Sequence, residues 1–125
     1  MSAATTATAS TAPLRVLFCI GVLPANFEAD GATLRRLLDV LKEVFGNLKE
    51  RFGIDVLGTM DDDKLMVGPS TAFPWTSYIL ADVPDLDTVA AVTNLLRVTE
   101  VDGHRLWRYL RIEARVGRPL FFGNA

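Results

Sequence analysis

The chain has 125 residues, half of them hydrophobic and 22% charged, and its formal net charge is −2 at pH 7. The length predicts one domain, and the apolar content excludes a disordered chain because it is sufficient to offset the entropy of ordering. The acidic balance argues against nucleic-acid binding, and the single cysteine excludes an intrachain disulfide. No apolar run approaches the ~20 residues that a membrane-spanning helix needs.

Residues 2–12 are small and uncharged, a composition typical of a disordered segment. They lack the basic start and the strongly apolar stretch of a secretory signal peptide, so we expect a cytoplasmic protein. The sequence predicts a disordered N-terminal tail over residues 1–13, one folded domain over residues 14–120 and a C-terminal tail over residues 121–125.

The first half of the domain contains a strand, a long helix and a second strand. A run of β-branched and large apolar residues over residues 14–22 predicts a strand that is buried on at least one face. Leucine and phenylalanine recur every three or four positions over residues 30–52, the spacing of one helix face. Gly53 is typical of a helix C-terminus, and residues 54–60 predict a second strand.

The second half repeats this order after a hairpin. An acidic turn is expected to lead into a short returning strand over residues 64–67. Residues 75–83 predict a third main strand, and Asp85 is a suitable N-cap for a second helix that ends near residue 98. Residues 105–116 predict the last strand.

This order of elements predicts an α+β domain of the ferredoxin-like βαββαβ type, with an antiparallel sheet and two helices on one face. A three-layer doubly wound sheet would need more helices, placed on both faces. RNA-recognition modules of similar topology carry an aromatic run on the third strand, which this sequence lacks. Acylphosphatase-like domains carry an arginine in the loop after the first strand, and the sequence lacks this as well.

The last predicted strand has two different faces. Its even-numbered residues are mostly apolar and suit a core beneath the helices. A face that only met water would be mostly small, polar and charged. We therefore expect a second copy of the chain to cover the other face, giving a homodimer of the dimeric α+β barrel type with a pocket between sheet and loops. That face combines large aromatic and charged residues: Trp107, Tyr109, Arg111, Glu113 and Arg115.

The candidate acid–base residues each have a plain structural alternative. Asp61 is the carboxylate of the acidic turn best placed to point inward, while its two neighbours are expected to be solvated. His104 has a suitable pKa for a general base, although a solvated histidine is the more common outcome in a turn. One histidine and one cysteine, Cys19, cannot supply a zinc site, and the acidic turn lacks the spacing of a calcium loop, so we expect no metal. The glycine-rich motifs of nucleotide cofactors are absent, and we expect no cofactor.

The charged residues of the last strand allow two interpretations. They could form an ion-pair ladder across strands or between subunits. The alternative is a ligand site in which Arg111 or Arg115 binds a carboxylate and Glu113 or Asp61 transfers a proton. The apolar walls of such a site would be the aromatic side chains Trp75, Trp107 and Tyr109.

Six segments between Leu14 and Leu120 carry a family resemblance: LFCIG, VLGTMDDD, MVGPS, PWTSYILADVP, LWRY and IEARVGR. Together they resemble a family of small proteins encoded in bacterial indole-3-acetate catabolic gene clusters, the B component of that pathway. The resemblance implies a cytoplasmic role in degrading an indolic, carboxylate-bearing aromatic compound. It assigns no chemical step and no catalytic residue.

Two functions are compatible with these observations. The first is a cofactor-independent enzyme, an isomerase, hydrolase or oxygenase-type barrel that acts on an oxidised indole-3-acetate derivative. The second is a non-catalytic partner or carrier that protects an unstable intermediate for the pathway's oxygenase. An acid–base pair inside the cleft favours the enzyme, and a purely apolar cavity favours the carrier. For both we expect a homodimer that binds a small aromatic carboxylate and neither nucleic acid nor a membrane.

Overall fold

The computed structural model describes residues 12–68 and 75–123. Over these residues the protein has an α+β fold built on one four-stranded antiparallel sheet. The order of strands across this sheet is β2-β3-β1-β6. The strands are β1 (Leu14–Val22), β2 (Asp55–Asp61), β3 (Trp75–Val83) and β6 (Leu110–Gly117).

The structure describes only part of the two predicted tails. Residues 1–11 of the N-terminal tail are outside the described residues, and so are residues 124–125 of the C-terminal tail. Residues 69–74, between β2 and β3, are also outside. The predicted returning strand over residues 64–67 is wrong, because these residues form no strand and are exposed.

Alternation along the central strand separates the two faces of the sheet. Val16 and Phe18 on β1 are fully buried and pack in a cluster with Val92 and other apolar residues. Phe18 lies opposite Ile79 on β3 and Ala114 on β6, which pack against the same cluster. The even-numbered residues of β1 therefore face the core, as the period of two along a strand requires.

The predicted long helix is two helices, α3 (Gly31–Val44) and α4 (Leu48–Phe52). α3 begins at Asp30, whose carboxylate accepts a hydrogen bond from the Thr33 amide at 2.7 Å, a regular N-cap. The break follows from the left-handed backbone at Asn47, with φ of 51°, which cannot continue a helix. The apolar spacing predicted a single helix because the three- to four-residue period of leucine and phenylalanine continues in the sequence from residue 34 to residue 52.

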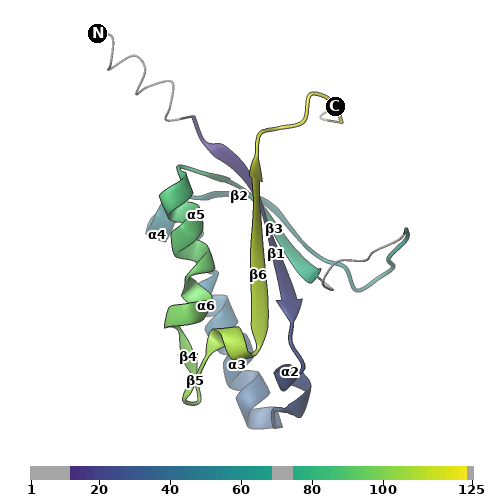
Figure 1. The fold of residues 1–125 in the computed structure, drawn as a ribbon, viewed down its shortest axis with the longest axis vertical. Coiled ribbons are helices and arrows are strands. Elements are labelled where there is room, and N and C mark those ends of the chain that lie inside the picture. The colour runs from purple at the N-terminus through teal and green to yellow at the C-terminus, as the bar shows by residue number, and fades with distance from the viewer. Residues whose placement is uncertain (1–11, 69–74, 124–125) are drawn as a thin grey trace.

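The second predicted helix is also interrupted. Asp85 caps α5 (Leu86–Thr93), its carboxylate accepting from the Thr88 amide at 2.8 Å, as predicted. A four-residue helix, α6 (Leu95–Val98), follows directly. Another short helix, α2 (Ala25–Glu28), follows β1. Helices α3 to α6 lie to one side of the sheet in Figure 1, and no helix within the described ranges is long and apolar enough to span a membrane.

The last strand is shorter than predicted and begins at Leu110 instead of residue 105. The preceding residues form a two-stranded hairpin, β4 (Glu100–Val101) with β5 (His104–Arg105), and a 3-10 turn, η1 (Leu106–Arg108). This turn brings both Leu106 and Tyr109 into one buried cluster, which a continuous strand could not do because their parities differ. The predicted common face of Trp107 and Tyr109 with the charged residues of β6 is therefore wrong.

The sheet face opposite the helices carries a mixture of charged and apolar side chains. Arg15 donates to Asp82 across the β1–β3 pair at 2.7 Å. Next to this ion pair, Leu17 lies opposite Leu80, and Met60 on β2 is exposed. We refer to this surface as the open face, because no helix within residues 12–68 and 75–123 packs on it.

Candidate functional site

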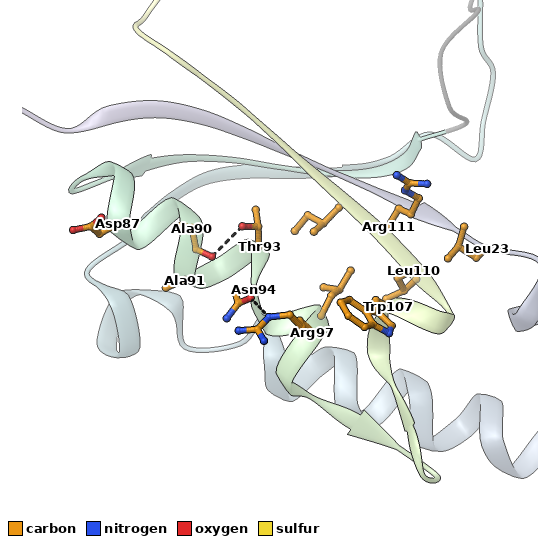
Figure 2. A pocket seen from close by; sticks show the side chains of 12 residues that line it. Leu23, Asp87, Ala90, Ala91, Thr93, Asn94, Arg97, Trp107, Leu110 and Arg111 are labelled. Carbon is orange, nitrogen blue, oxygen red and sulfur yellow. Dashed lines mark hydrogen bonds between the residues drawn. The ribbon is translucent and has the colours of Figure 1, made fainter.

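A pocket of about 830 Å³ lies between the helices α5 and α6, the turn η1 and the first residues of β6. We call it the β6-edge pocket (Figure 2). Its volume is within the range of ~300–1,000 Å³ typical of small-ligand sites. It is lined by Leu23, Asp87, Ala90, Ala91, Thr93, Asn94, Leu96, Arg97, Trp107, Leu110, Arg111 and Ile112.

Arg97, Arg111 and Trp107 supply the basic and aromatic groups of this pocket. In Figure 2, Arg97 and Trp107 lie on the helix side of β6, the Arg111 side chain extends from the other side of the β6 ribbon, and Asp87 lies at the far end of α5. Trp107 is 52% exposed, a large fraction for a tryptophan. The lining therefore combines an accessible aromatic surface with an excess of positive charge, two arginines against one carboxylate.

Neighbouring groups hold two of these side chains in position. The Nε of Arg97 donates to the Oδ1 of Asn94 at 2.6 Å, one turn earlier in the chain. The guanidinium of Arg105 lies 5.7 Å from the centre of the Trp107 ring, within the range of a cation–π contact. Arg105 also donates to the Arg97 carbonyl oxygen at 3.1 Å, which connects the hairpin to α6.

Chemically, this arrangement suits an anionic, planar ligand. Guanidinium groups bind carboxylates through two parallel hydrogen bonds, and aromatic rings of a ligand stack on tryptophan. The apolar floor formed by Leu96, Leu110 and Ile112 would bury the body of such a ligand. The pocket contains no histidine or cysteine, and Asp87 is its one acidic residue.

The β6-edge pocket contains two of the eight predicted site residues, Trp107 and Arg111. Tyr109 is 4% exposed, and its ring packs in the core beside Leu106. Trp75 does not line this pocket; it lies at the start of β3, opposite Gly21, which pairs with Arg111 on its other side. The carbonyl oxygen of Trp75 accepts a hydrogen bond from Tyr78.

Glu113 and Arg115 form an ion pair on the open face. The Arg115 Nε donates to the Glu113 carboxylate at 2.8 Å, and this hydrogen bond raises the pKa of Arg115. The contact joins two residues of the same strand, so it is not the ladder across strands or between subunits considered for the last strand. Arg111, two residues earlier, has the same parity as Glu113 and Arg115 along β6, and it also lines the β6-edge pocket at the edge of the sheet.

Two further titratable groups lie beside this ion pair. Cys19 is 1% exposed between its cross-strand neighbours Tyr78 and Glu113, and burial raises the pKa of its thiol. Burial also raises the pKa of Tyr78, reinforced by the hydrogen bond that its hydroxyl donates to Asp62 at 3.1 Å.

The remaining candidates, His104 and Asp61, lie apart from each other. His104 is exposed on the β4–β5 hairpin and lines a small cavity of about 300 Å³ with Asp102 and Glu28. Asp61 ends β2 and lines a mainly apolar cavity between α3 and the sheet. Within the described residues no group of three or more histidine, cysteine, aspartate or glutamate side chains is arranged to hold a metal ion.

Sequence reasoning missed Arg97 and Asn94. Both occur on the polar side of a predicted helix, where such residues are usually solvated. Only the interruption after α5, which turns α6 toward η1, places them beside Trp107. The two residues are three positions apart in the sequence, a spacing that allows a hydrogen bond between them on a helix. This spacing does not indicate whether the pair lines a pocket or lies on an open surface.

Comparison with known proteins adds little to this description. No protein-family model matches the chain, and no curated protein matches it either. Among solved structures, the chain is similar to a protein of unknown function from Rhodopseudomonas palustris, with 15% identity over 96% of this chain and 95% of that one and a TM-score of 0.44. The fold and the pocket define an α+β protein with a basic, aromatic-rimmed cavity at one edge of its sheet.

Proposed function

We propose that the β6-edge pocket binds a small aromatic carboxylate, and that the protein is a cytoplasmic component of indole-3-acetate degradation. The observation that carries the proposal is the presence of Arg97 and the exposed Trp107 ring beside one apolar floor, with Arg111 as a second basic residue at the edge of the pocket. The family resemblance of the sequence supports the same ligand class, because an indole-3-acetate derivative has both an aromatic body and a carboxylate.

The composition of this pocket favours binding over catalysis. Asp87 is its one acidic residue, and it lies at the opposite end from the arginines in Figure 2. An acid–base pair next to the ligand would support an enzyme, and the pocket does not contain one. A ligand-binding or accessory role beside the pathway's oxygenase is therefore the function that the pocket supports best.

An enzymatic role is the second candidate, and Asp61 favours it. Its carboxylate accepts no hydrogen bond and forms no ion pair with any residue in the described ranges, and it lines a cavity with mainly apolar walls. As an isomerase, hydrolase or oxygenase-type enzyme, the purified protein alone would convert a defined intermediate that accumulates in a gene-deletion strain grown on indole-3-acetate. Asp61→Asn would abolish that conversion.

The proposal for the whole molecule is a homodimer of the dimeric α+β barrel type. The order of strands and helices supports a ferredoxin-like βαββαβ topology, with the two helical segments between strands on one face. Leu17, Leu80 and Met60 support self-association, since they form an apolar strip on a face that no described helix covers.

Titration calorimetry with two matched ligands tests the binding proposal. Indole-3-acetate should bind the wild-type protein, and indole-3-acetamide, which lacks the charge, should bind at least tenfold more weakly. Arg97→Gln should reduce the affinity for the acid by about tenfold, the usual effect of losing a hydrogen bond between charged groups. Arg35→Gln, on the exposed side of α3, is the control and should bind like wild type. Equal affinities for acid and amide would contradict the proposal.

A further inference from the structure

A second cavity, of about 670 Å³, lies between α3 and the sheet, and we call it the α3 cavity. We propose that it binds a neutral aromatic compound that carries one N–H or O–H donor, and that Asp61 accepts the hydrogen bond from that donor. This site is separate from the β6-edge pocket, with which it shares only Leu110. The inference concerns binding and does not rest on the β6-edge pocket, and it places beside Asp61 a neutral ligand, not the anionic substrate of the enzymatic candidate.

The apolar wall of the α3 cavity comes from one side of α3. Leu34, Leu37, Leu38 and Leu41 recur at the spacing that places them on neighbouring positions of a helix. Leu37 is buried in the core, whereas Leu34 and Leu38 are 36% and 58% exposed at the rim. Exposed leucine side chains at the rim of a concave, mainly apolar cavity are typical of a ligand site.

The cavity also reaches between the two layers of the fold. Ile20 and Ile79 line it from the sheet, on the face that the helices cover. Both are only partly buried, so α3 does not cover the sheet completely at this place. A small molecule that enters the cavity would contact these two side chains, whereas a protein partner would lie mainly on the outer surface of α3. The extension of the cavity to the sheet therefore favours a small ligand.

The charged groups of the lining decide the chemical class of this ligand. Asp61 and Lys42 are the acidic and the basic residue of the α3 cavity, and their charges cancel. The β6-edge pocket differs because it has two arginines against one aspartate. A neutral ligand fits the α3 cavity better than an anion, since an anion would lie in apolar surroundings without a surplus of positive charge.

Asp61 supplies the polar contact. It lies on β2 opposite Ser77. Thr59 and Asn26 also line the cavity. A carboxylate only accepts hydrogen bonds when ionised. Asp61 is exposed and has no protein donor among the residues that the structure describes, so a ligand N–H or O–H can replace water at its carboxylate.

Fluorescence of N-phenyl-1-naphthylamine, a neutral aromatic amine with one N–H, tests the proposal on the full chain. The probe should bind saturably with one site per chain. Leu38→Lys, which places a charge at the rim, should reduce its affinity at least tenfold. Leu86→Lys is the matched control, because Leu86 is a similarly exposed leucine on α5 outside the cavity. Circular dichroism establishes that both variants are folded.

The role of Asp61 is tested with a second probe that lacks the donor. Asp61→Asn should weaken N-phenyl-1-naphthylamine about fivefold, because a hydrogen bond to a charged acceptor is stronger than one to an amide. The same variant should bind N-methyl-N-phenyl-1-naphthylamine as wild type does. An equal loss for both probes would overturn the assignment of Asp61.

Three results would overturn the site itself. These are the absence of saturable binding, wild-type affinity in Leu38→Lys, and a change in the sedimenting mass of Leu38→Lys, which would identify the surface as a protein interface. Arg97→Gln should leave probe binding unchanged. Failure of the α3 cavity and failure of the β6-edge pocket are therefore distinguishable.

Discussion

Asp102 connects the β4–β5 hairpin to α3 through side-chain contacts. Its two carboxylate oxygens accept hydrogen bonds from Arg36 Nε and Nη2, both at 2.6 Å, and Thr33 Oγ1 donates to it at 2.9 Å. Asp102 has a positive φ of 52°, a conformation that aspartate tolerates better than most residues. The hairpin that positions η1 and Trp107 is thus held to the helix at its turn.

This contact predicts a pH-dependent contribution to stability. The hydrogen bond from Arg36, and then that from Thr33, lowers the pKa of Asp102 below its ordinary value of 3.8. A carboxyl group whose pKa is lower in the folded state stabilises the fold above its unfolded pKa, and this contribution is lost as the pH falls through the folded pKa. Asp102→Asn should therefore lower the urea midpoint at pH 7, and the difference from wild type should shrink below pH 4.

Urea titrations of both proteins at pH 7 and at pH 3 measure this difference, with Asp39→Asn on the exposed side of α3 as the control. A difference that is the same at both values of pH would show that Asp102 contributes through packing and not through its charge.

The sequence identified part of the β6-edge pocket at the scale of single residues. Trp107 and Arg111 were predicted to bind a common ligand, and they do line one pocket, but for a different reason from the one given. The prediction put both on one strand, whereas η1 turns Trp107 to the edge of β6. Over so few residues, the pattern of apolar and polar side chains in the sequence does not distinguish a strand from a 3-10 turn.

At the scale of elements, the break between α3 and α4 depends on Gly46. A Cβ at this position would overlap the carbonyl oxygen of Lys42, which belongs to the backbone of α3 and cannot move away. Arg51 completes the junction by donating to the carbonyl oxygens of Glu43, Val44 and Gly46 at 2.6–3.0 Å. These bonds satisfy acceptors that the end of a helix leaves unpaired.

Gly46→Ala should therefore destabilise the protein by about 1–3 kcal/mol, the usual cost of an overpacked site. Gly31→Ala is the matched control, since a Cβ at Gly31, in the first turn of α3, meets nothing within 4 Å. Alanine there should stabilise the protein by about 0.5–1 kcal/mol, because glycine loses more conformational entropy on folding. Chemical denaturation measures both effects, and equal stabilities of the two variants would contradict this account of the junction.

Strands β1, β2 and β3 and the start of the first helix were predictable because local signals and packing agree there. Residues 14–22 are apolar enough to specify a central strand, and Asp30 and Asp85 cap helices through contacts three residues away. The junctions at Asn47 and Asn94 were not predictable, because the apolar face continues through both. These helices end because of their backbone geometry and their contacts with distant segments. The hydrophobic period of the sequence contains no information about either.

For the molecule as a whole, the open face predicts self-association. Leu80 is 36% exposed in the middle of the sheet and lies opposite Leu17, beside the Arg15–Asp82 ion pair. Two copies that pack these faces together would bury the apolar strip and form a closed two-fold dimer. The wild-type protein should sediment at twice its chain mass of 13.7 kDa.

Leu80→Glu should shift the sedimenting species to the single-chain mass, because a closed dimer would bury the new charge in both copies. Leu86→Glu, with the substitution on α5, is the control and should remain dimeric. A wild-type protein that sediments as a single chain at tens of micromolar would contradict the dimer.

The pairing of β1 also has a consequence for how the chain folds during synthesis. Val16 lies opposite Val116, so the central strand of the sheet obtains one neighbour from a segment 100 residues later. Until the ribosome has produced the end of the chain, β1 can pair with β3 on one side, but the backbone groups on its other side have no partner strand. Such unpaired edges bind other chains. Chains that stop before β6 should therefore aggregate or be degraded. The last segment made is the one that closes the sheet.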